Sequence, residues 1–248
     1  TNICGKYHPY QVEKYFKLAV FYLNQADFKK GIQILNDAID IHDRIEHEEK
    51  SRIGIMALLA LAFIGLENYF EAENTLRRLL DILEEEFGAE NIAVTSVLLE
   101  IARIRNLQQD WNETEAFLNR ALRIRSATLG HNHLSCVEIL NELGWFHFGR
   151  GNCDSAKTVF SKALSIVTLK LGNEPSDLAP MLTGLAEVHR FLGNYIQSKK
   201  LFQRALNILE QNSSQNSDHI IQCLHGLFEI FGTVNDYQNL IDTGRRLI

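Results

Sequence analysis

The sequence has few residues that interrupt helices or crosslink small secreted folds. Only three of its 248 residues are proline, and all three lie near the start or between the repeated segments described below. Long helices can therefore form between them. The four cysteines are scattered, and none belongs to a Cys-x-x-Cys pair. This pattern favours reduced, buried thiols in a cytoplasmic protein over disulfides or a cysteine metal site.

Long apolar runs and strong charge are lacking too. No stretch reaches about 18 uninterrupted apolar residues and no signal-peptide pattern opens the chain, so we expect neither a membrane span nor secretion. The net charge of −6 is mild, and no basic position recurs where a groove would form. Nucleic-acid binding needs a concentrated cationic surface, so we do not expect a nucleic-acid partner.

Enzyme motifs are also missing from the sequence. It contains no nucleophile elbow, P-loop, dinucleotide fingerprint or cluster with metal-ligand spacing. The pair His131 and His133 is the nearest approach to a metal site, but a histidine pair in a loop is weak evidence for one. We therefore expect no catalytic residue, no metal and no cofactor.

One short pattern does occur six times along the chain. Each copy has an apolar residue, usually a small residue next to it, and an Asn or Asp nine positions after the apolar one. An aromatic residue usually follows the Asn or Asp. The apolar residues are Leu18, Leu59, Ile101, Leu143, Leu185 and Leu227, and the Asx residues are Asp27, Asn68, Asp110, Asn152, Asn194 and Asp236. Self-similarity at a period of about 42 residues is typical of a solenoid.

Each copy is predicted to form two helices. In the fourth copy, Leu140, Leu143 and His147 share one face of a first helix, which Gly149 and Gly151 end. Asn152 is the expected N-cap of the second helix. That helix carries apolar residues at helical spacing and ends near Gly172; the residues are Ala156, Phe160, Ala163, Leu164 and Val167.

A helix pair alone leaves an apolar face uncovered, so the pairs must stack on one another. We predict an all-α fold, a right-handed α-solenoid of about six antiparallel helix pairs. It would form a single array over 1–248, with units at about 10–50, 51–92, 93–134, 135–176, 177–218 and 219–248. Small residues at fixed positions would let the paired helices approach closely.

The repeated small–aromatic–small arrangement resembles the tetratricopeptide repeat over essentially the whole chain. The copies are longer than the usual unit of that family, which has about 34 residues. This extra length and the Leu-Gly pairs between copies are similar to kinesin-light-chain repeats, which carry Leu-Gly-x-x-His-Pro there. The motif is most complete at Gly5-Lys6-Tyr7-His8-Pro9 and survives partly at Gly130 to His133. Asn91 and Pro175 replace its histidine elsewhere, and the linker 212–218 lacks it.

Both ends of the sequence read as interrupted repeats. Residues 4–9 resemble the tail of a preceding repeat, and 244–248 stop where other second helices continue. Terminal repeats normally carry polar caps, and neither end offers an obvious one. We expect a segment excised from a longer protein.

The resemblance implies that the first helices line a concave groove that binds a partner. The expected contact residues are Arg103, Asn106, Asn141, Trp145, Phe148, Glu187 and Arg190. Asn141 lies in a Leu-Asn-x-Leu-Gly stretch similar to the kinesin-light-chain Leu-Asn-Asn-Leu-Ala, whose Asn hydrogen-bonds a peptide backbone. Trp145 and Phe148 would be aromatic anchors, although Trp145 also suits a place in the core.

Two functions follow from this reading. The first is a non-catalytic protein-interaction scaffold or adaptor that binds a peptide or helix of a partner protein in the groove. The second is a regulatory or autoinhibitory segment of a larger protein, such as a protease, an NTPase or a transcription regulator. In the second case flanking domains of the same chain could occupy the groove, and binding would be relayed through changes of curvature.

Overall fold

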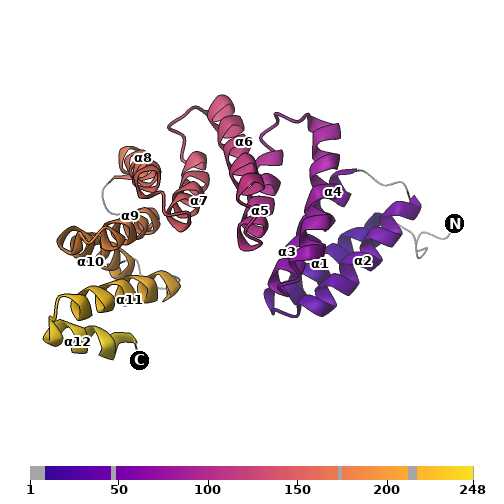
Figure 1. The fold of residues 1–248 in the computed structure, drawn as a ribbon. Coiled ribbons are helices and arrows are strands. Elements are labelled where there is room, and N and C mark those ends of the chain that lie inside the picture. The colour runs from indigo at the N-terminus through magenta and orange to yellow at the C-terminus, as the bar shows by residue number, and fades with distance from the viewer. Residues whose placement is uncertain (1–8, 46–48, 173–174, 212–216, 248) are drawn as a thin grey trace. The chain divides into compact units, whose positions relative to one another are not determined.

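The computed structural model describes residues 9–45, 49–172, 175–211 and 217–247. The Gly5-to-His8 part of the predicted motif and most of the 212–218 linker lie outside these residues. The described part contains α-helices and one short 3₁₀ helix, and no strand (Figure 1). The helices are α1 (Pro9–Asn24), α2 (Phe28–Ile45), α3 (Glu49–Gly65), α4 (Tyr69–Phe87), α5 (Val94–Leu107), α6 (Trp111–Leu129), α7 (Ser135–Gly149), α8 (Cys153–Leu171), η1 (Ser176–Leu178), α9 (Ala179–Phe191), α10 (Tyr195–Gln211), α11 (Ser217–Thr233) and α12 (Tyr237–Leu247).

The chain divides into two compact units, 1–124 and 125–248. In the first unit α1 packs on α2 and α3 on α4, and each pair packs on the next helix along the chain. In the second unit the pairs are α7 with α8, α9 with α10 and α11 with α12, again stacked in sequence. The prediction of an all-α solenoid of antiparallel helix pairs is confirmed.

The predicted period is visible in the helix boundaries. The second helices α4, α6, α8, α10 and α12 begin at equal intervals, at Tyr69, Trp111, Cys153, Tyr195 and Tyr237. The Asx residue before the second helix acts as its N-cap: Asn152 Oδ1 accepts a hydrogen bond from the Ser155 N–H at 3.3 Å. Equivalent bonds are made by Asp27, Asn68, Asp110 and Asp236. These bonds satisfy backbone donors that the helix cannot satisfy itself.

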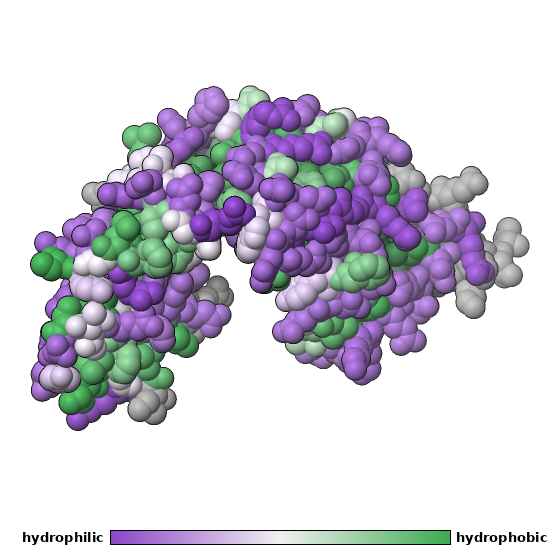
Figure 2. Space-filling model, in the orientation of Figure 1, coloured by the Kyte–Doolittle hydropathy of each residue, from purple (hydrophilic) through white to green (hydrophobic). Residues whose placement is uncertain are grey.

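The cores of both units consist of the aligned apolar positions. The second-helix positions that align with Phe160 and Ala163 are almost completely buried in every copy whose burial is given, and they are Leu35, Leu76, Leu118, Phe160 and Phe202, with Ala38, Leu79, Ala121, Ala163 and Ala205. The face drawn in Figure 2 is largely hydrophilic, with hydrophobic side chains in separate patches. The alternation of buried and polar helix faces therefore follows the sequence pattern.

The described cysteines Cys136, Cys153 and Cys223 are buried free thiols. None of the described helices combines the length and the apolar character that crossing a membrane requires.

Candidate functional site

In the second unit, α7 packs on α9 and α9 on α11, so the first helices of successive pairs adjoin one another. We call their shared surface the first-helix face; it carries Asn141, Trp145 and Phe148 on α7 and Glu187 and Arg190 on α9. All five side chains are half-buried. The second unit thus places five of the seven predicted contact residues on two adjoining helices.

The rings of Trp145 and Phe148 take part in the packing of this face. Trp145 meets Phe148 edge-on at 5.9 Å and Phe160 at 5.4 Å between ring centroids. Phe148 in turn meets Phe191 edge-on at 6.0 Å. Edge-to-face geometry at these separations is the favourable one for aromatic pairs. Both rings therefore support the helix packing and leave only part of their surface for a ligand.

The charged side chains of α9 form a network with α11. Arg190 donates through Nε to Glu187 Oε2 at 2.9 Å, and its Nη1 lies 2.6 Å from Glu229 Oε2. His225 Nδ1 lies 3.8 Å from the other Glu229 oxygen. Two carboxylates thus share one guanidinium, which fixes Arg190 between two helices and leaves the network with an excess of acceptors.

Asn141 has a buried oxygen with no donor. Within the described part of the chain, Oδ1 is out of contact with solvent and has no hydrogen-bond partner. An unsatisfied buried acceptor costs about 1–3 kcal/mol, so native structures rarely contain one without a reason. Asn141 also lines a pocket of about 320 Å³ between α7, α8 and α9.

Arg103 and Asn106 lie on α5, in the first unit. Arg103 Nη1 is 2.6 Å from Glu100 Oε1 on the same helix, and both Arg103 and Asn106 are half-buried. Leu99, which holds the register position of Asn141, is fully buried. The first helix of this copy therefore has a buried leucine at the Asn141 position, and its charged pair, Glu100 and Arg103, holds the positions of Glu142 and Trp145.

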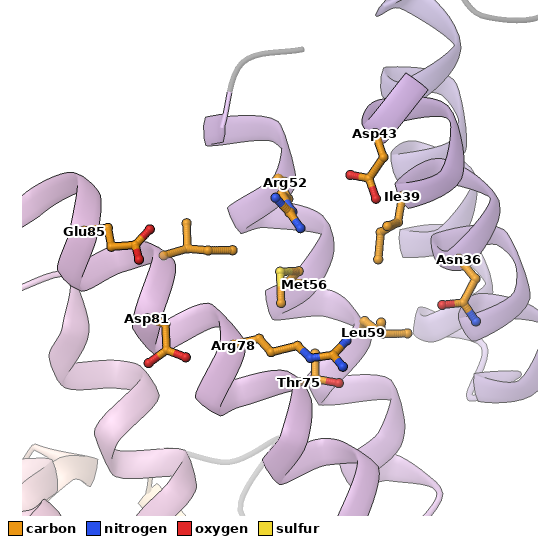
Figure 3. Close-up of a pocket in the computed structure, with 11 residues that line it drawn as sticks. Asn36, Ile39, Asp43, Arg52, Met56, Leu59, Thr75, Arg78, Asp81 and Glu85 are labelled. Atoms are coloured by element: carbon orange, nitrogen blue, oxygen red, sulfur yellow. The ribbon is translucent and has the colours of Figure 1, made fainter. Parts of the chain in front are cut away.

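A groove in the first unit was not predicted from the sequence. It has a volume of about 450 Å³ and runs between α2 and α4 over α3 (Figure 3). Met56 and Leu59 form its apolar floor, and the guanidinium of Arg78 lies beside Leu59 and Thr75. The residues of α4 that line the groove belong to no sequence motif. The position of Arg78 within the repeat is the one feature of the sequence that sets the groove apart.

That register makes Arg78 unusual. Arg120 holds the same position in the next copy and donates from Nη2 to Glu84 Oε1 at 2.7 Å, and Arg246 pairs with Glu210 in the same way. No ion pair of Arg78 is found among the described residues, because His42 occupies the position that corresponds to Glu84 and Glu210. Asp43, Asp81, Glu85 and Arg52 also line the groove, so its lining does not favour a ligand of one sign.

The surroundings of two reactive groups, the Cys223 thiol and the His133 imidazole, are defined in the described part of the chain. Burial raises the pKa of the Cys223 thiol, although its hydrogen bond with Thr183 opposes that shift. In the part of the chain that the structure describes, no three His, Cys, Asp or Glu side chains are grouped to hold a metal ion. His133 instead accepts a hydrogen bond from the Ser135 N–H through Nδ1, at 3.1 Å.

Residues 93–168 match the family model of the tetratricopeptide repeat. No protein with a curated description is similar enough in sequence to match the chain. Among solved structures, a putative kinesin light chain from Podosopora anserina with nearly identical TPR-like repeats is 19% identical, with a TM-score of 0.69 over 84% of this chain and 99% of that one.

Two further solved structures cover almost the whole chain. A Signal Transduction ATPase with Numerous Domains from Pyrococcus horikoshii, which has a tetratricopeptide repeat sensor, is 16% identical with a TM-score of 0.73. The match covers 94% of this chain and 34% of that one. A Rap protein in complex with competence and sporulation factor is 14% identical with a TM-score of 0.65, over 96% and 74% of the two chains. These similarities establish the fold.

Proposed function

Residues 93–168 are tetratricopeptide repeats and the remaining described helices have the same fold, and from this premise we propose that the chain is a non-catalytic adaptor. It binds an extended or helical segment of a partner protein on the first-helix face of residues 125–248. In the first unit, taken by itself, Arg103 and Asn106 of α5 are the proposed contact residues. We propose a cytoplasmic location, in keeping with the reduced state expected of the cysteines.

The observation that carries this proposal is the unsatisfied polar chemistry of the first-helix face. Asn141 Oδ1 has no donor in the described structure, and the residue Asn141 lines a pocket. Glu187 and Glu229 share one arginine, so their carboxylates retain lone pairs for further donors. A polypeptide supplies N–H donors in a regular row, and it would satisfy acceptors of this kind. The Rap protein, whose structure contains competence and sporulation factor, shows that a chain with this fold takes a ligand.

The test is selection from a random peptide library displayed on phage, using the purified chain as target. We expect enriched peptides that bind the chain and lose about tenfold or more in affinity when Glu187 and Arg190 are both replaced by alanine. Removing both residues leaves no unmatched charge from this pair, and Glu229, which loses its arginine in the double variant, is partly exposed to solvent. Circular dichroism establishes that the variant remains folded.

The matched control is the double variant Glu210→Ala and Arg246→Ala. It removes an ion pair between second helices of the same unit, so it leaves the first-helix face intact and should not change peptide affinity. An absence of enriched peptides, or equal loss in both double variants, would contradict the proposed function.

A second function is favoured by one comparison. The chain matches only 34% of the ATPase whose tetratricopeptide repeats form a sensor. As a sensor of that kind, the chain would regulate a catalytic domain of its own polypeptide, and the segment it binds would belong to that polypeptide. Peptide selection separates the two functions. A consensus sequence of the enriched peptides that occurs only in the full gene product supports regulation, and one that occurs in other proteins supports an adaptor.

A further inference from the structure

The pocket beside Asn141 combines apolar walls with two carboxylates and one carboxamide. Its walls are formed by Leu134, Val137, Val167, Pro180 and Met181, and its polar side chains are Glu138, Asn141 and Asp177. Carboxylates only accept hydrogen bonds, and the buried atom of Asn141 is its oxygen. Among the described residues, no basic side chain lines the pocket. The two carboxylates therefore favour a ligand that supplies donors at the end of an apolar stem.

The register of the repeats explains why Asn141 lacks a donor. Thr183 holds the same position in the next copy, and its Oγ1 lies 3.4 Å from Cys223 Sγ, so these two groups hydrogen-bond to each other. Met181 stands as far along the chain from Asn141 as Cys223 stands from Thr183. A thioether has no hydrogen to donate. The copy that contains Asn141 thus has a methionine, which cannot donate, where its neighbour has the hydrogen-bonding partner Cys223.

The charges at the pocket are unequally neutralised. Arg125 Nη1 lies 3.3 Å from Glu138 Oε2 and also donates to the Ser135 carbonyl at 2.5 Å. The charge of Glu138 is therefore partly balanced by a guanidinium that the Ser135 carbonyl also contacts. Asp177, on η1, makes no ion pair with any residue the structure describes, and it is exposed. The pocket therefore keeps one negative charge that no cation of the described chain balances.

We propose that this pocket receives a lysine side chain of the bound partner segment. Its alkyl stem packs on Leu134, Val137 and Pro180, the apolar lining residues that have accessible surface, and its ammonium group has three donors for three acceptor side chains. The Asn141 amide can turn about χ2, a torsion with only broad preferences, and so direct Oδ1 toward the ammonium group. The inference deepens the proposed function, because it names the side chain that a segment on the first-helix face would place there.

The probe for the experiment is Nα-acetyl-lysine methylamide, titrated into the ¹⁵N-labelled chain and followed by amide chemical shifts. The comparison probe carries a second acetyl group on Nε, which keeps the stem and removes the charge. We expect saturable shifts at Val137, Asn141 and Met181, and about threefold to fivefold weaker binding of the uncharged probe. Asp177→Asn should weaken the lysine probe by a similar factor and leave the uncharged probe unaffected.

Asp218→Asn is the matched control, because it removes an exposed carboxylate from the first turn of α11 in the same unit. It should leave both probes unchanged. Equal binding of the two probes, shifts elsewhere on the chain, or an unaltered lysine affinity in Asp177→Asn would overturn the proposal. If selected peptides still bind the first-helix face in that case, the proposed function stands without the lysine pocket. If the lysine probe binds and no peptide is selected, the proposed function falls instead.

Discussion

At the scale of single residues, the packing between copies depends on a match between phenylalanine and glycine. A side-chain carbon added at Gly184 would lie 2.5 Å from the Phe160 ring, and Gly226 is at least as close to Phe202. Where leucine replaces the phenylalanine, at Leu76, the corresponding first-helix residue is Glu100. A large ring on the second helix thus requires a residue without Cβ on the next first helix.

Gly184→Ala should therefore destabilise the chain by about 1–3 kcal/mol, because the ring cannot move far in a filled core. Urea denaturation measures the loss. Adding Phe160→Leu should make the two changes much less than additive. Gly149→Ala is the control, since nothing lies within 4 Å of the added carbon there. Equal effects of the two alanine substitutions would contradict this explanation of the glycine.

The buried carboxylate of Glu73 gives a second prediction at this scale. Glu73 is 7% exposed and lies between Arg77, at 2.7 Å, and Arg105. Arg105→Ala removes one of its two cations and should cost about 1–3 kcal/mol in the free energy of unfolding. Arg123→Ala breaks an exposed pair with Glu90 and should change stability too little to measure. A similar loss in both variants would argue against burial as the cause.

At the scale of elements, one contact between a second helix and the next first helix is built in three different ways. Glu73 of α4 forms an ion pair with Arg105 of α5. At the equivalent positions of a later copy, Lys157 of α8 adjoins His189 of α9. Lys199 lies over the Phe231 ring, 4.7 Å from its centroid. The fold brings these two positions into contact in each copy, and the residue types at them determine whether the two side chains attract each other.

The pair of Lys157 and His189 should make stability depend on pH. Burial, together with the charge of Lys157, lowers the pKa of His189 below its ordinary value of about 6.5. The unfolded chain then binds the proton more readily than the folded one. The contribution is present above the unfolded pKa and is lost as pH falls from about 6.5 through the lower folded value.

We expect the thermal unfolding midpoint to fall between about pH 7.5 and pH 5, and to fall less in His189→Gln. Lys157→Ala should raise the pKa of His189, which proton NMR titration of the imidazole measures directly. An unchanged pKa in that variant would mean that the lysine charge does not reach the ring.

At the scale of the whole molecule, helices of the same unit are buried to very different extents. In α9 most residues from Ala179 to Val188 are buried, whereas in α12 only Thr243 is. The stability of a repeat array is close to a sum of the terms for each repeat and each interface. Local opening should therefore be uneven along the second unit.

Hydrogen exchange should show this difference. We expect the amides of α12 to exchange at least about tenfold faster than those of α9 under native conditions. Mass spectrometry of peptides from the two helices gives the measurement. Equal protection of the two helices would indicate that the second unit unfolds as one cooperative block.

The sequence determined the helix pairs, their period and their caps, because these depend on local hydrogen bonding and on apolar spacing within one copy. It indicated a left-handed turn at Gly151, but not at the corresponding residues Ala26, Glu67 and Gln109, which occupy the same conformation. There the packing of the two helices imposes the turn on residues that do not prefer it.

Tertiary structure alone decided what the predicted contact residues do. Asn141, Leu99 and Thr183 hold the same position in three copies, yet their surroundings differ. The Asn141 oxygen lacks a donor, Leu99 is part of the core, and Thr183 is hydrogen-bonded to Cys223. Trp145 and Phe148 proved to pack on neighbouring rings. Such differences arise from contacts between copies, where each side chain meets a partner from the next repeat, and no pattern within a single copy specifies that partner.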